Sequence, residues 1–294
     1  MTCKAYRAAI LHSIADPADV GIEASYEYFE DGLLVVENGQ IKAVGPASEL
    51  LATLTGDIDV TECKDALITP GFIDTHIHFP QTGMIGAYGE QLLDWLNTYT
   101  FPCENQFADK AHADEVADIF LKELLRNGTT TALVFGSVHP QSVDALFEAA
   151  QRLDLRLIAG KVMMDRNAPE YLTDTAETSY IESKALIERW HGKGRLHYAV
   201  TPRFAPTSTP EQLTLAGQLL GGAWRVIDNH GFKTAVGDAG QGAGVLAGVF
   251  GGGQTDQYRN NQITDGQCPV FGVSQLGGVQ LHTAERGVAA QNAG

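Results

Sequence analysis

Two histidines, His76 and His78, stand one residue apart at the end of an apolar run. In an extended strand, residues two apart share a face, so Asp74, His76 and His78 point the same way. Neutral imidazoles are common ligands of Zn²⁺. We therefore predict that His76 and His78 are metal ligands and that Asp74 supports them from the same strand.

The surroundings of these histidines favour a catalytic position over a purely structural one. An apolar run broken by Pro70-Gly71 leads into them, and a series of alternating strands and helices follows. In barrels built from such β/α units, the active site lies at the carboxyl ends of the strands. The histidines stand at that end of the first predicted strand.

The elements that would position this site form at least four β/α units. The periodicity predicts helices over 114–127, 142–153, 180–191 and 209–220, and strands over 66–78, 129–135, 155–163 and 196–201. Alternating strands and helices imply parallel pairing with right-handed crossovers. A (β/α)8 barrel needs eight units, so residues 67–220 are predicted to be the first half of a TIM barrel.

The first 66 residues have a different character. Residues 32–45 contain two apolar runs that flank Asn38-Gly39, which is a strong signal for a hairpin with a type I′ turn. Shorter strand-like segments surround the hairpin. We predict a small all-β module over residues 1–66.

Residues 221–294 differ from both preceding parts. They contain 17 of the 32 glycines, and no amphipathic period is visible in them. Composition of this kind disfavours a packed core. We predict an irregular or disordered tail, so that the whole chain is of the α/β class with a β module, an incomplete barrel and this tail.

Several separated blocks resemble the guanine deaminase family of the amidohydrolase superfamily, in the same order and over about residues 1–220. The blocks are Pro70–His78 with the following Phe-Pro-Gln81, Leu92–Pro102, Asn127–Thr131, Gly160–Asp165 and Val200–Phe204. The resemblance implies that the N-terminal module is part of a composite β-sandwich. It also implies a zinc enzyme that hydrolyses guanine to xanthine and ammonia, with one Zn²⁺ per subunit, in a homodimer.

The resemblance assigns roles to five residues of this chain. His76 and His78 would bind Zn²⁺, and Gln81, Arg203 and Phe204 would hold the purine. An arginine offers a rigid fork of donors, and an aromatic ring packs against a flat base. The residues alone leave simpler interpretations open: Gln81 as an ordinary loop residue, Arg203 as a surface ion-pair partner and Phe204 as core.

The remaining family residues are not evident, so the catalytic acid/base groups are unknown. The family places a third His and a Glu after the fifth strand as His-x-x-Glu, a further His after the sixth strand and an Asp after the eighth. His282–Glu285 matches the first pattern, but we interpret it as a chance match. One hypothesis is that an unrelated reading frame follows about Leu220.

Two alternatives therefore accompany guanine deamination. One is an amidohydrolase that acts on another heterocycle, such as an 8-oxoguanine deaminase or a chlorohydrolase. The other is a non-catalytic fragment. Gln81 and Arg203 with Phe204 favour guanine.

Charge and cysteine content limit the partners and the compartment. The net charge of −16 argues against nucleic acid or an anionic membrane as partner. The four cysteines lack metal-site or disulfide-framework spacing, and neither a signal peptide nor a membrane span is evident. We expect a cytoplasmic protein.

Overall fold

The computed structural model describes residues 3–56, 58–89, 91–220 and 226–227 of the chain. The chain divides into two compact units, the first ending at Phe72 and the second beginning at Ile73. The domain limits expected from the sequence stay a prediction. Most of the glycine-rich tail lies outside the described residues, and so do His282–Glu285.

The first unit contains a four-stranded sheet in the order β3-β2-β1-β4. The strands are β1 (Cys3–Ser13), β2 (Tyr26–Glu37), β3 (Gln40–Pro46) and β4 (Val60–Ile68). Strand β2 is antiparallel to β1 and to β3, whereas β4 is parallel to β1. Short helical segments connect them: α1 (Pro17–Val20), α2 (Ala47–Leu50) and η1 (Leu51–Thr53).

The predicted hairpin is confirmed. Glu37 faces Gln40 across the turn, and Asn38 and Gly39 have φ angles of 52° and 78°. Positive φ at both central residues defines the type I′ turn, which suits the twist of the flanking strands. One face of the sheet packs a small core that includes Leu33 and Val35.

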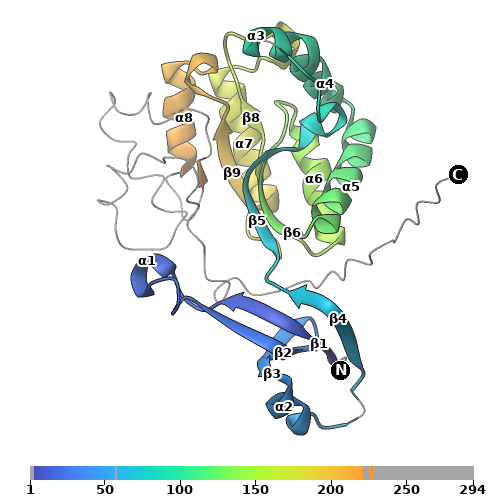
Figure 1. The fold of residues 1–294 in the computed structure, drawn as a ribbon. Helices are drawn as coiled ribbons and strands as arrows, with labels where there is room; N and C mark the ends of the chain where they lie inside the picture. The colour runs from blue at the N-terminus through green and yellow to red at the C-terminus, as the bar shows by residue number, and fades with distance from the viewer. Residues whose placement is uncertain (1–2, 57, 90, 221–225, 228–294) are drawn as a thin grey trace, which may run out of the picture. The chain divides into compact units, whose positions relative to one another are not determined.

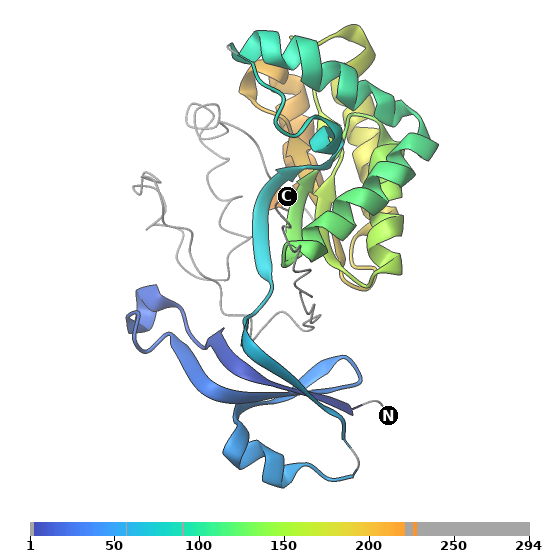
Figure 2. The same cartoon turned by 45° about the vertical axis from the view of Figure 1, so that its right-hand side comes forward.

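The second unit is built on a sheet in the order β10-β9-β7-β6-β5, with β8 pairing to β9. Its strands are β5 (Phe72–His78), β6 (Thr129–Phe135), β7 (Arg156–Gly160), β8 (Val162–Met163), β9 (Leu196–Pro202) and β10 (Val226–Ile227). The pairs β6–β7, β7–β9, β8–β9 and β9–β10 are parallel. This confirms the predicted parallel α/β half-barrel, in which β5 stands at one edge of the sheet (Figure 2).

Four longer helices cover one side of this sheet (Figure 1). They are α5 (Lys110–Arg126), α6 (Pro140–Arg152), α7 (Ala176–Trp190) and α8 (Pro210–Leu220). Shorter segments complete the unit: η2 (Phe79–Met84), α3 (Leu92–Trp95), η3 (Leu96–Thr100), α4 (Phe101–Asn105), η4 (Gln106–Ala108), η5 (Glu170–Leu172) and η6 (Ala205–Thr207). No helix in the described part of the chain is long and apolar enough to cross a membrane.

Local capping explains where these helices begin. Helix α5 starts four residues before the predicted Asp114, because the Asp109 carboxylate accepts a hydrogen bond from the Ala111 amide at 2.9 Å. Helix α8 begins with Pro210, one residue inside the predicted range, and the Thr209 hydroxyl caps it by accepting a hydrogen bond from the Gln212 amide at 3.2 Å.

The predicted strand over 155–163 is interrupted at Lys161, which separates β7 from β8. The Lys161 amide donates at 3.2 Å to a side chain of the neighbouring strand, the Tyr198 hydroxyl of β9. Its ammonium group is fully buried and lies 2.6 Å from Asp174 Oδ2. A buried charge needs such a partner, and the hydrophobic period of the sequence does not reveal it.

Candidate active site

His76 and His78, here called the imidazole pair, lie at the carboxyl end of β5. Their ring centroids are 5.3 Å apart, and the rings meet edge to face. The Asp74 carboxylate accepts a hydrogen bond from the His76 amide at 3.0 Å, so Asp74 supports the strand backbone. The two-residue period of the strand thus brings both imidazoles to one place, as the sequence predicts.

Phe135, the last residue of β6, packs against both members of the imidazole pair. Its ring is stacked on His78 with a centroid distance of 4.6 Å and lies 5.1 Å from His76. The side chain is fully buried and belongs to an apolar cluster with Leu96 and Phe101. The two imidazoles therefore rest on a rigid aromatic support.

The imidazole pair fits part of a metal's donor set. Zinc takes four ligands in a tetrahedral arrangement, and imidazole nitrogens are among its usual donors. Across residues 3–56, 58–89, 91–220 and 226–227, no group of three or more His, Cys, Asp or Glu side chains could hold a metal ion. The described part of the chain thus provides two candidate ligands, both from β5.

A buried carboxylate, Glu104 on α4, joins the two polar residues predicted to hold a purine. Gln81 Nε2 donates to Glu104 Oε1 at 3.1 Å. Arg203 Nη1 donates to Glu104 Oε2 at 2.5 Å, across 99 positions of sequence. The side chains of Glu104 and Arg203 are only 1% and 6% exposed. We call Gln81, Glu104 and Arg203 the Glu104 cluster.

Three further contacts fix the Glu104 cluster in place. The Cys103 thiol donates to the Pro80 carbonyl at 3.2 Å, which ties α4 to η2 beside the contact between Glu104 and Gln81. The Arg203 guanidinium carbon lies 5.7 Å from the centre of the Phe101 ring, a cation–π distance. The Arg203 amide donates to the Met163 carbonyl of β8 at 3.1 Å.

Phe101 links the two groups of polar side chains. It belongs to the same apolar cluster as Phe135, so one hydrophobic patch lies behind both the imidazole pair and the Arg203 guanidinium. His78, Phe135 and Arg203 lie at or directly after the ends of β5, β6 and β9. These are the carboxyl ends of the strands, where barrel enzymes have their active sites.

Phe204 follows Arg203 in an extended conformation and precedes η6. It is half-buried, and its carbonyl accepts hydrogen bonds from the Thr207 amide and hydroxyl, both at 3.0 Å. The backbone at Phe204 is therefore held by a local turn. Its predicted contact with a base stays a prediction.

His139 lies at the carboxyl end of β6 and directly precedes α6. Burial, followed by the positive charge of Lys161, lowers the pKa of His139 below its ordinary value of 6.5. Its Nε2 atom is buried and has no hydrogen-bond partner among the described residues. A neutral imidazole is the form that this environment favours.

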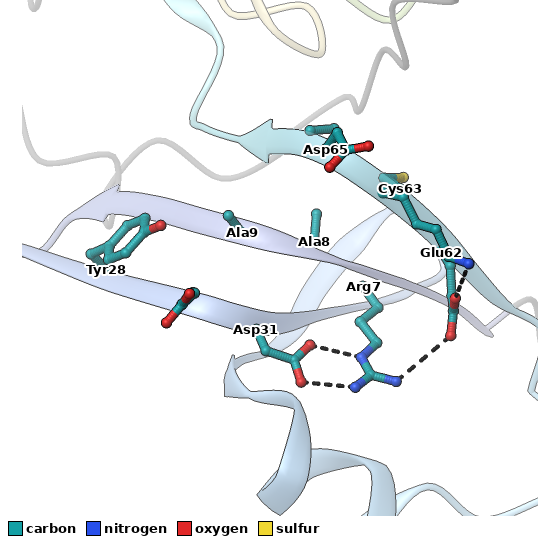
Figure 3. Close-up of a pocket in the computed structure, with 11 residues that line it drawn as sticks. Arg7, Ala8, Ala9, Tyr28, Asp31, Glu62, Cys63 and Asp65 are labelled. Carbon is teal, nitrogen blue, oxygen red and sulfur yellow. Dashed lines mark hydrogen bonds and ion pairs between the residues drawn. The ribbon is translucent and has the colours of Figure 1, made fainter.

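A separate concavity of about 440 Å³ lies in the first unit, against β1, β2 and β4 (Figure 3). Arg7 extends between two carboxylates there, at 2.7 Å from Asp31 and 3.6 Å from Glu62. The hydrogen bond from Arg7 and its charge lower the pKa of Asp31. Arg7 thus offsets one of the two negative charges beside it, and none of the residues predicted for the site lines this concavity.

Sequence reasoning missed Glu104 and Phe135 as members of the site. Glu104 stands two residues beyond the resembling block that ends at Pro102, and on a short helix it has the pattern of an ordinary surface carboxylate. Phe135 has the pattern of a buried strand residue, which it also is. Its place in the sequence could have identified Phe135, because it is the last residue of a predicted strand. The carboxyl ends of barrel strands meet at the face that holds the active site.

The parallel half-barrel, with the candidate side chains at the ends of its strands, has the architecture of the amidohydrolases. The chain belongs to the amidohydrolase family, whose model matches residues 67–220. Membership in this family implies a metal cofactor.

Among curated proteins, the guanine deaminase of Escherichia coli is 55% identical over 221 residues, which cover 74% of this chain and 50% of that protein. The crystal structure of guanine deaminase from Bradyrhizobium japonicum matches with a TM-score of 0.74 and 42% identity, covering 78% of this chain and 50% of that one. An adenosine deaminase from Xanthomonas campestris with bound zinc shares the fold at a TM-score of 0.64 and 18% identity, over 81% of this chain and 52% of that one. The chain spans about half the length of the curated relatives that it matches.

Proposed function

We propose that this chain carries the metal-binding strand and the purine-binding side chains of a zinc-dependent guanine deaminase. The proposed reaction is guanine plus water to xanthine plus ammonia. The observation that carries the proposal is the meeting of Gln81 and Arg203 on Glu104, beside a strand that ends in the imidazole pair. The identity of 55% with a guanine deaminase supports the choice of substrate.

His76 and His78 would hold the Zn²⁺ as neutral imidazoles. When bound, the metal supplies a Lewis acid that makes water nucleophilic near neutral pH. Phe135 holds the two rings against a buried surface, so their positions do not have to be organised when the metal binds. Pre-organisation of this kind favours binding because less side-chain freedom is lost.

Gln81, Arg203 and Phe204 would bind and orient the purine. Arg203 carries five N–H donors, of which Glu104 takes one among the described contacts, and the others can serve ring or carbonyl acceptors of a base. Gln81 can add an acceptor, and the half-buried Phe204 an apolar surface. Together they would place the amino-bearing carbon of guanine toward the metal.

The test is zinc content and guanine turnover on the purified chain. We expect bound zinc, measured by elemental analysis. Formation of xanthine, measured by chromatography, decides whether the chain is catalytic. The double variant His76→Ala/His78→Ala should lose the zinc, whereas His12→Ala should keep it, because His12 pairs with Glu27 in the first unit at 3.1 Å.

Each outcome separates this proposal from its alternatives. Turnover of 8-oxoguanine or a chlorinated heterocycle in preference to guanine would identify another member of the family. Zinc without any turnover would identify a non-catalytic binding chain. A chain with neither zinc nor xanthine would refute the proposal for this polypeptide.

The proposed assembly and location follow from the same comparison and from composition. The family resemblance suggests a homodimer, which light scattering on the purified chain would test. The acidic composition suggests a cytoplasmic protein, and localisation of a tagged copy would test it.

A further inference from the structure

We propose that Glu104 is a positioning residue. It fixes which end of the Gln81 amide faces the base and where the Arg203 guanidinium lies, and it so sets a preference for guanine over adenine. The inference rests on the proposed purine site. It adds a residue that acts through two others without touching the substrate.

Glu104 and Arg203 are 1% and 6% exposed, and a charge removed from water at that depth is costly unless it is paired. The contact of 2.5 Å between Arg203 Nη1 and Glu104 Oε2 supplies the pairing. It also orients the planar guanidinium, because the N–H groups of arginine form a rigid fork.

Glu104 also sets the orientation of the Gln81 side-chain amide. A side-chain amide can turn over and exchange its donor and acceptor ends. An ionised carboxylate only accepts hydrogen bonds, so the amino group of Gln81 must face Glu104, as the 3.1 Å contact has it. The carbonyl oxygen of Gln81 then points away from Glu104 and presents an acceptor.

Guanine and adenine present opposite hydrogen-bonding patterns to such a pair of side chains. Guanine offers a carbonyl acceptor beside a ring N–H donor, whereas adenine offers an amino donor beside a ring acceptor. An arginine donor with a glutamine acceptor is complementary to the first arrangement and opposed to the second. A site whose buried polar groups are left unpaired by the wrong ligand discriminates strongly.

Glu104 is itself held in place by its surroundings. Glu104 sits on α4, which is tied to η2 through the bond from the Cys103 thiol to the Pro80 carbonyl at 3.2 Å. Phe101 of the same helix supports the guanidinium of Arg203. The carboxylate therefore has a fixed position relative to both residues that it orients.

The experiment compares guanine and adenine binding to the full chain and its variants, by calorimetry or fluorescence. In Glu104→Gln, the partner of Gln81 can both donate and accept, so the amide can turn over. We expect guanine affinity to fall at least tenfold and the preference for guanine over adenine to collapse. Glu104→Asp keeps an acceptor-only carboxylate, so it should bind both bases less tightly but retain the preference.

A matched control separates positioning from structural support. Asp174→Asn also removes a largely buried, paired carboxylate, one that lies 2.6 Å from Lys161. Among the described residues, Asp174 makes no hydrogen bond or ion pair with the Glu104 cluster. It should lower the melting temperature without changing the ratio of the two affinities. Thermal unfolding of every variant shows whether it is folded.

Three results would overturn the inference. One is a guanine-to-adenine ratio in Glu104→Gln equal to that of the wild type. Another is a wild-type chain that binds neither base, since there would be nothing to position. The third applies if Glu104→Gln does not fold: it is a guanine affinity in Glu104→Asp equal to that of the wild type. Zinc content and xanthine formation are measured separately, so failure of the proposed deamination is distinguishable from failure of this inference.

Discussion

Replacing Lys161 with Met should destabilise the second unit strongly, although Met has a similar length. The Lys161 side chain is fully buried, and its ammonium lies 2.6 Å from Asp174 and 3.2 Å from Glu182. The substitution removes one charge and leaves the Asp174 carboxylate, which is 9% exposed, without its cationic partner. Breaking a buried pair in this way costs about 3–5 kcal/mol.

The remaining partners of Asp174 place the expected value at the lower end of that range. Its Oδ1 atom accepts hydrogen bonds from the Met164 amide at 3.1 Å and from Gln212 Nε2 at 3.0 Å. We therefore expect a loss of about 3 kcal/mol, which lowers the melting temperature of a domain of this size by about 6–12 °C.

The assay is urea unfolding with a double-mutant cycle. Adding Asp174→Leu to Lys161→Met should recover part of the lost stability, because the carboxylate left without a cation is removed while the Met164 amide and Gln212 Nε2 lose an acceptor. The control Lys110→Met removes an exposed partner of Asp114 and Glu148 and should cost less than about 1 kcal/mol. Equal effects of the two lysine variants, or independent effects of Lys161 and Asp174, would refute the reasoning.

Three further predictions concern close packing, the imidazole pair and pH. Gly160→Ala should lower the free energy of unfolding by about 1–3 kcal/mol or more, because the new Cβ would lie 2.0 Å from the Ala199 carbonyl oxygen. The control Gly217→Ala has open space around its Cβ and should not destabilise the protein, as urea midpoints of both variants would show. Phe135→Leu removes the ring contacts with His76 and His78, each worth about 0.5–1.5 kcal/mol. We therefore expect zinc to bind about tenfold more weakly in competition titrations. Unchanged zinc affinity would show that Phe135 does not support the imidazole pair. Burial and nearby positive groups lower the pKa of His197 from its ordinary value of 6.5, so the folded state favours the neutral imidazole. The unfolded state therefore binds the proton first, and stability is lost as pH falls through 6.5. His197→Gln should show a shallower fall of the urea midpoint over this pH range.

The order and type of the elements follow closely from local patterns. The strand predicted over 129–135 is β6, and the Asn38-Gly39 turn has the predicted conformation. The departures have local polar causes that hydrophobic periodicity does not encode. The Asp109 cap lengthens α5 at its start, and the buried ammonium of Lys161 splits one predicted strand into β7 and β8.

For the candidate site, too, the sequence determined some features and the tertiary structure decided the others. His76 and His78 share a face because they are two apart on one strand, so the sequence by itself determined the imidazole pair. The blocks of resemblance also identified Gln81 and Arg203 one at a time, without indicating that they meet.

Only the tertiary structure decided how these groups are held together. Glu104 reaches Arg203 across 99 positions because the parallel strands bring their carboxyl ends to the same edge. Phe135 comes under the imidazole pair because β6 lies next to β5 in the sheet. Strand order and burial set such contacts, and neither is written in the spacing of residues along one element.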